Sequence, residues 1–537
     1  MSHLVQYGTL AIVFLAAATN VNAAGRSPQA VAADVDALIE KMLTENKVPL
    51  SAKADDAEFI RRASLDITGR IPTAERVSAF LSETTPNKRA RLIDELLADE
   101  EYGEHFAIIW YHRMVRIDDD NRYTVRGNTF AGWLEKSFNR NDGWNKIASN
   151  ILMAQGPRDK NPETTFYLAN VDDNKAGFNP APNKITSAAS KLFLGIKLEC
   201  CECHNHPFNT LKQTDYWGVA AFFDDIHGDN TRKKELKDGA IPGVHEGAAV
   251  TKKKDSSNAP FGSIEIPDTK GKTVKAKYLL GTEAPLANHP SLRKLFVTWM
   301  TSPQNKYFSQ AAVNKMWANF FGRGIVEPVD DIDMDKATHP DVLKLLSKDF
   351  AASGYDLKYL IRCICLSETY QRTSAVLPGN KDDEKLYSHM RAKVMSADML
   401  YDSLEVVLGH GVGTSGKGPD VKKKTGGGRE EFRKFFHADA DDDVGVVDDY
   451  THGVPQVLRL MNSGAISNSN ALVTRLMKAG EPEKVIDSMY LTVLSRQPTA
   501  AEVQKMTAYA AADKFSTKAY SDLVCVLLNS GEFLFNH

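Results

Sequence analysis

Half of the chain's six cysteines lie within four positions, in the stretch LECCECHNHPF that covers residues 198–208. Cys200 and Cys203 are followed directly by His204, and this C-x-x-C-H order is the sequence pattern of covalent c-type haem attachment. Thiols at this spacing can reach the two vinyl groups on one edge of a porphyrin, and the next side chain can ligate the iron. The pattern predicts a c-type haem held by Cys200 and Cys203, with His204 as an axial ligand.

A second axial ligand would have to come from another segment, because His206 is too close along the chain to reach the opposite face of the haem. His105 and His112 are seven residues apart in EHFAIIWYHRMVRI, residues 104–117. That spacing places both on one face of a helix, so either can serve as the distal ligand. Met114 in the same segment is a further candidate.

A bare metal ion is the alternative to haem at this cluster. Cys200 and Cys203 have the spacing of a zinc knuckle, and His206 follows three positions later. Cys200, Cys203 and His206 can hold one tetrahedral zinc or iron ion with His105, His112 or His227 as a fourth ligand, and His204 would then point away or support the ligands. With His204 kept as a candidate, the candidate metal ligands are Cys200, Cys203, His204 and His206. A Cys200–Cys203 disulfide is a third hypothesis. The neighbouring thiol of Cys201 complicates all three hypotheses, because it can pair in place of a motif cysteine.

The segments around the cluster are predicted to be helical. Apolar residues recur at spacings of three and four throughout residues 30–226, as in AEFIRRASLDIT (57–68). KITSAASKLFLGI (184–196) precedes the cluster and TDYWGVAAFFDDI (214–226) follows it. The cluster is therefore expected in a connection between two helices.

The rest of the chain divides by composition. Residues 227–288 are rich in Gly, Lys and Asp, and two short alternating runs around DTKGK predict a small hairpin. The helical pattern returns over 289–537, with an expected flexible insertion at 409–450. We therefore predict a mainly α fold, in which helical domains 30–226 and 289–537 are joined by a small β-containing segment.

Two stretches far apart in the chain resemble each other. LDITGRIPTAERV (65–77) and LTVLSRQPTAAEV (491–503) share an Arg, a Pro-Thr-Ala run and a closing Val. Each predicts a helix end, a tight turn and a capped helix start, and Thr499 with Glu502 has the spacing of a capping box. Convergent capping chemistry and an ancient duplication explain the likeness equally well.

The first residues predict export. Residues 9–19 are apolar and Val21-Asn22-Ala23 resembles a cleavage site, so residues 1–23 are expected to be a signal peptide, although no Lys or Arg precedes the apolar core. No later apolar run reaches 18 residues, so no transmembrane span is expected after cleavage. The formal net charge of −3 argues against nucleic acid as the main partner. We expect a periplasmic or cell-surface protein whose partners are envelope redox or surface proteins.

The chain resembles a family of exported, planctomycete-type two-domain proteins of uncharacterised function, whose N-terminal domain is called cytochrome-like. The stretches that carry the likeness are RRASLDITGRIPTAERVSAFL (61–81), LFLGIKLECCECHNHPFNTLKQTDYWGVAAFF (192–223), VNKMWANFFGRGIVEPVDDI (313–332) and DDYTHGVPQVLRLMNSG (448–464). The family pattern C-x-x-C-H-x-H-P-F implies a functional set of Cys200, Cys203, His204 and His206. It also implies that Cys201 is dispensable, because members usually have a small or polar residue there.

Together these observations predict a redox or electron-transfer protein with covalently attached haem. The alternatives are a zinc or iron site in an envelope enzyme and a structural metal staple in a scaffold protein. The resemblance gives His206 as firm a place as His204, although a haem requires only His204, and this favours a metal site or a haem with unusual surroundings. The sequence has no G-x-S-x-G, H-E-x-x-H or paired-carboxylate motif, so no catalytic residues are assigned.

Overall fold

The computed structural model describes residues 25–115, 124–171, 179–228, 243–247, 260–286, 291–409 and 469–537, together with Arg429 and Phe432. The predicted signal peptide and nearly all of the predicted insertion at 409–450 lie outside these residues. Within the described part, no helix is both long and apolar enough to cross a membrane.

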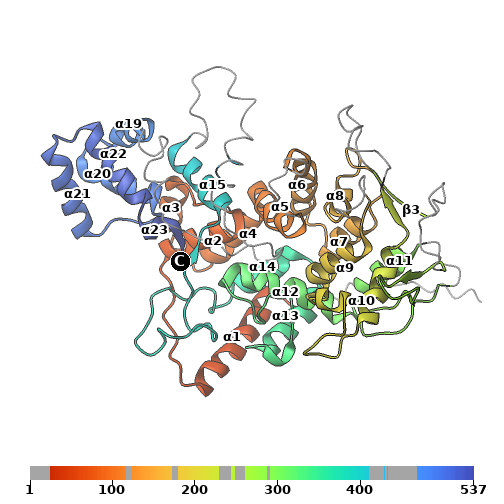
Figure 1. Ribbon diagram of the computed structural model, residues 1–537. Coiled ribbons are helices and arrows are strands. Elements are labelled where there is room, and N and C mark those ends of the chain that lie inside the picture. Colours follow the sequence, from red (N-terminus) through yellow and green to blue (C-terminus); the bar gives the residue numbers. More distant parts are fainter. Residues whose placement is uncertain are drawn as a thin grey trace, which may run out of the picture.

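The described residues are mainly α-helical, as predicted (Figure 1). The helices before the cysteine cluster are α1 (Pro28–Glu45), α2 (Asp56–Thr68), α3 (Ala74–Ser82), α4 (Lys88–Ala98), α5 (Glu100–Met114), α6 (Thr124–Asn139), α7 (Trp144–Leu152), η1 (Pro162–Thr164), α8 (Thr165–Leu168), α9 (Pro182–Ala189) and η2 (Ser190–Leu194). Those from the cluster onward are η3 (Glu199–Glu202), α10 (Gln213–Ala220), η4 (Ala221–Phe223), α11 (Leu292–Met300), α12 (Lys306–Phe321), η6 (Met334–Lys336), α13 (Pro340–Ala352), α14 (Leu357–Cys365), α15 (Ala397–Leu408), α19 (Asn470–Leu476), η8 (Met477–Ala479), α20 (Pro482–Val493), α21 (Ala500–Ala512), α22 (Thr517–Leu528) and α23 (Gly531–Leu534).

The strands are short and form three small antiparallel sheets. β1 (Gly156–Pro157), β3 (Gly243–Glu246) and β2 (Ile226–Gly228) pair in that order. β4 (Ser263–Glu265) pairs with β5 (Thr273–Lys275), and β6 (Lys393–Val394) pairs with β7 (Phe535–Asn536). The β4–β5 pair, in which Ile264 lies opposite Val274, is the hairpin predicted from the alternating runs.

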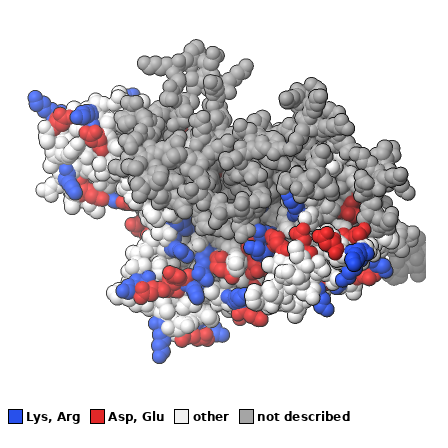
Figure 2. Space-filling model, viewed as in Figure 1, with Lys and Arg blue, Asp and Glu red and all other residues white. Residues whose placement is uncertain are grey.

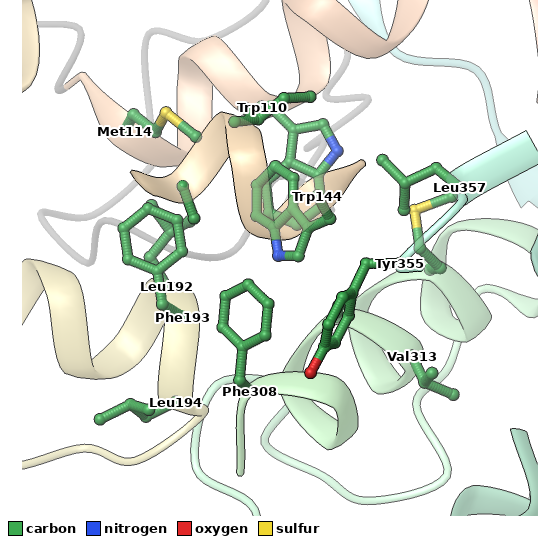
Figure 3. Packing of buried hydrophobic residues seen from close by; sticks show 14 of the residues in the cluster. Trp110, Met114, Trp144, Leu192, Phe193, Leu194, Phe308, Val313, Tyr355 and Leu357 are labelled. Atoms are coloured by element: carbon green, nitrogen blue, oxygen red, sulfur yellow. The ribbon is translucent and has the colours of Figure 1, made fainter. Parts of the chain in front are cut away.

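A large core of buried apolar residues takes members from both predicted helical domains, from Val31 to Met390. Figure 3 shows its aromatic centre, where Trp110 of α5 lies against Trp144 of α7 with ring centroids 4.1 Å apart. Phe193 of η2 packs 5.8 Å from Trp144, centroid to centroid. The turn that leads into the cysteine cluster is therefore anchored in this core.

A second core joins α15 to the C-terminal helices α19–α23, which form a group of their own beside α2, α3 and α15 in Figure 1. Leu65 and Ile71 from the N-terminal half belong to this second core. The fully buried Arg61 of α2 supports the contact, because its guanidinium donates to the carbonyls of Val493 (3.2 Å) and Phe533 (2.8 Å). The limits of the two helical domains, 30–226 and 289–537, stay a prediction.

The two similar stretches have the local structure predicted for them. α2 ends at Gly69, which has a φ of 72°, and the hydroxyl of Thr73 then caps α3. After α20, Ser495 has a φ of 60°, and Thr499 forms a reciprocal capping box with Glu502 at the start of α21. Both turns thus use a left-handed residue to end one helix and a threonine to start the next.

Lys and Arg side chains alternate with Asp and Glu side chains over the described part of the face drawn in Figure 2. This mixture agrees with the small formal net charge of −3.

Candidate cofactor site at Cys200–His206

The cysteine cluster lies in a connection between two helical segments, as predicted. η2, a single π-helical turn, ends at Leu194 with Gly195 as its C-cap residue. η3 contains Cys200 and Cys201, and Cys203 follows it directly as its C-cap residue, before α10 begins. Gly195 has a φ of 62°, and a Cβ placed on it would lie 2.8 Å from the Cδ1 atom of Ile332. The backbone N–H of Ile332 donates to the carbonyl of Gly195 at 2.7 Å. Glycine is therefore required at position 195, where Ile332 in the segment after α12 packs against the residue that follows η2.

The cysteines are distributed over different faces of a 3₁₀ turn. A 3₁₀-helix has three residues per turn, so side chains at positions i and i+3 lie on the same face. Cys200 and Cys203 have this spacing and both are exposed, whereas Cys201 is buried with 0% of its surface accessible. All of these thiols are free. The geometry therefore presents the two motif thiols together on the outside of the turn.

Cys201 belongs to the large apolar core, and burial raises the pKa of its thiol above the usual value of 9.0. Buried cysteines act as small apolar residues whose thiol has little tendency to ionise. Cys201 thus has a packing role, and this agrees with the inference that its thiol is not needed for the chemistry of the motif.

His204 is exposed, and its ring is oriented by its own loop. Its Nδ1 atom lies 2.8 Å from the carbonyl oxygen of Asn205. A carbonyl oxygen only accepts hydrogen bonds, so Nδ1 carries the proton and Nε2 of a neutral ring keeps its lone pair. Ligating histidines typically have this arrangement, in which one ring nitrogen donates to a carbonyl and the other binds the metal.

His206 has the opposite arrangement. Its Nδ1 atom accepts a hydrogen bond from the backbone N–H of Phe208 at 3.2 Å. The proton of a neutral His206 ring is therefore on Nε2, and coordination through Nε2 would require the ring to change tautomer and give up this bond. Phe208, which is 92% exposed, lies at the edge of this ring with centroids 6.3 Å apart. The Nε2 lone pair is therefore available on the neutral ring of His204 and not on that of His206.

Each candidate distal ligand has partners of its own in the structure. His112 Nε2 lies 3.4 Å from a carboxylate oxygen of Asp398 in α15. The negative charge of the same carboxylate raises the pKa of the buried His105, against the stronger effect of burial. Met114 is buried in the large core, and His227 lies 3.6 Å from Asp225. Within the described ranges, no three His, Cys, Asp or Glu side chains are grouped so that they could hold a metal ion. The distal assignments of His105 and His112 stay a prediction.

The donor set of the turn fits a c-type haem. Cys200 and Cys203 are free and exposed, and the residue after Cys203 is an exposed histidine with an available ring nitrogen. A bare ion would need His206 to change its proton position and would need a further ligand from elsewhere. Cys200, Cys203 and His204 are therefore the residues that would hold the haem.

Several polar side chains that fix this turn were missed from the sequence: Asn183, Glu202, Gln213, Tyr216 and Trp217. The only signal available was their place: Glu202 lies between the cysteines, and the others lie before and after them in PNKITSAA and KQTDYWGVA. Such residues form helices and caps in most sequences, so their contacts with the turn could be recognised only in three dimensions.

Comparison with known families gives two matches. Residues 34–228 match PSCyt2, a protein of unknown function (DUF1549), and residues 292–442 match PSD1, a protein of unknown function (DUF1553). The chain belongs to the family that joins these two regions. The PSCyt2 region contains the cysteine cluster. The PSD1 region contains Ile332, whose backbone N–H donates to the carbonyl of Gly195 just before the cluster. Searches among curated proteins and among solved structures gave no match.

Proposed function

We propose that the protein is an exported redox protein that carries a c-type haem, covalently attached through Cys200 and Cys203, with His204 as an axial ligand. The observation that carries this proposal is the hydrogen bond from His204 Nδ1 to the carbonyl of Asn205, next to the free and exposed thiols of Cys200 and Cys203. It leaves Nε2 available as the ligand atom at the residue where the C-x-x-C-H pattern needs it.

The chain's own residues have separate tasks in this proposal. Cys200 and Cys203 would hold the haem covalently through their thiols, and Cys201 belongs to the large apolar core. Asn205 keeps the His204 proton on Nδ1 through its carbonyl oxygen. The bound haem would supply one-electron transfer, which suits an electron carrier that meets envelope redox partners.

The experiment is expression of the full chain in a host with haem-maturation machinery. We expect haem that stays on the chain in a denaturing gel and gives the visible spectrum of a c-type centre, at one per chain. The double variant C200S/C203S should lose all covalent haem. H204A should alter the axial-ligand bands, whereas the matched controls C201S and H206N should keep covalent haem.

A chain that carries no haem but holds one zinc or iron ion by elemental analysis would refute the proposal. That result would favour the bare-metal alternative, in an enzyme or as a structural staple, and H206N should then lose the ion. A chain with neither haem nor metal would refute both.

Export is part of the same proposal. Cell fractionation and N-terminal sequencing should find the mature protein in the periplasm or at the cell surface, beginning at Ala24. An uncleaved chain in the cytoplasm would argue against the signal peptide at residues 1–23 and against an envelope redox role.

A further inference from the structure

We propose that Glu202 is the positioning residue of this site: it holds the 3₁₀ turn so that Cys200, Cys203 and His204 face outward and Cys201 faces inward. Glu202 lies between the cysteines of the motif, at one of the two positions that the C-x-x-C-H pattern leaves unspecified. The functional importance of this positioning rests on the proposed function, whereas the contacts that hold Glu202 do not depend on any cofactor.

The side chain of Glu202 is held by the helices on either side of the cluster, α9 and α10, which contact each other and lie side by side in Figure 1. Asn183 Nδ2 of α9 donates to Glu202 Oε1 at 2.9 Å. The hydroxyl of Tyr216 of α10 lies 3.2 Å from Glu202 Oε2 and 2.9 Å from the carbonyl of Asn183. Glu202 Oε1 therefore has a donor of its own from α9, and Oε2 shares the single proton of the Tyr216 hydroxyl on α10 with the carbonyl of Asn183.

The backbone of Glu202 is held as firmly as its side chain. Its carbonyl oxygen accepts from Trp217 Nε1 at 2.9 Å and from Gln213 Nε2 at 3.1 Å. The Gln213 amide also donates to the carbonyl of Cys203 at 3.0 Å. Two side chains of α10 thus satisfy carbonyls that a short 3₁₀ turn leaves without intrahelical partners.

These contacts fix the orientation of the turn, because its faces are about 120° apart. Once Glu202 is turned toward α9 and α10, the residue before it must face the core, and the outer face falls to Cys200 and Cys203. Free rotation of the turn would instead expose Cys201 and bury a motif thiol. The neighbouring carboxylate of Glu199 is bound to Lys191 at 3.2 Å, which makes it a matched acidic control.

The test is alkylation of the full-length chain prepared without haem. Limiting N-ethylmaleimide followed by peptide mass spectrometry measures each cysteine separately. In the wild type, Cys200 and Cys203 should react while Cys201 stays protected. E202A should raise labelling of Cys201 relative to Cys200 about tenfold, as expected for the loss of the Asn183 hydrogen bond and of the contact with Tyr216. E202Q, which can keep hydrogen bonds to both helices, should restore protection to within about twofold, and E199A should leave it unchanged.

Cys365, which is fully buried in α14, reports on global unfolding in the same experiment. If E202A also exposes Cys365, Y216F is the second variant, and labelling of Cys201 should then rise about threefold while Cys365 stays protected. Protection of Cys201 in every folded variant would overturn the inference, as would a failure of E202Q to restore it. Because this measurement needs no haem, it judges Glu202 even if the proposed haem is never found.

Discussion

Replacement of His105 by glutamine should make the protein about 2 kcal/mol less sensitive to acidification between pH 7 and pH 5. His105 is 9% exposed in α5 and packs against Phe106, with ring centroids 5.4 Å apart. It also packs closely on Gly69, where an added Cβ would lie 2.3 Å from His105 Nδ1. A proton on this ring would therefore have to be accommodated in a site with little access to water.

The magnitude follows from the pKa of His105. Burial lowers this pKa from 6.5 to about 3, and the positive charges of Arg70, Lys393 and Arg429 act in the same direction. The carboxylate of Asp398 opposes them. Below pH 6.5 the unfolded chain binds a proton here that the native chain does not, so the free energy of unfolding falls as the pH falls. The slope is about 1.4 kcal/mol per pH unit, or about 2 kcal/mol from pH 6.5 to pH 5, and the loss continues to about pH 3.

The assay is urea unfolding of the wild type and H105Q at both pH values. The packing that H105Q loses is the same at pH 7 and pH 5, so only the change in the difference between the two proteins reports on the proton. His339 is also buried, with its pKa lowered to about 4, but it is present in both proteins and cancels. We expect H105Q to be the less stable protein at pH 7 and to lose about 2 kcal/mol of that deficit at pH 5.

The reasoning would be refuted by a deficit that is the same at both pH values. His105 would then have the same charge in the native and unfolded chains, and burial would not control its protonation.

Three further predictions concern packing, and each is checked by urea unfolding. C201S should cost about 2 kcal/mol more than C201A, because serine buries a hydroxyl among apolar neighbours, and equal costs would contradict the core position of Cys201. G195A should cost about 2 kcal/mol, because alanine meets both the positive φ and the Ile332 side chain, and a neutral effect would mean that this contact yields freely. R61A should cost about 3 kcal/mol, because it leaves buried carbonyls without donors. Limited proteolysis should then release the α19–α23 group first, and uniform cleavage along the chain would argue against this.

Much of the fold follows from local sequence rules. The spacing of apolar residues gave helices around the cluster and the hairpin at β4–β5, and Thr73 and Thr499 cap the helices that follow the two similar turns. Such features depend on contacts within a few residues, so they can be predicted from short windows of sequence. Leu65 and Ile71 belong to a core whose other members begin at Met395, and this contact has no such local signal.

The sequence by itself determined which residues are the candidate cofactor ligands, because thiol and imidazole chemistry depends on residue type and the C-x-x-C-H order is local. Only the tertiary structure decided which of them face outward. The orientation of the turn depends on Asn183 of α9 and on Tyr216 and Trp217 of α10, which act across space on Glu202. The proton positions of His204 and His206 depend in the same way on which backbone group each ring meets, a carbonyl in one case and an N–H in the other.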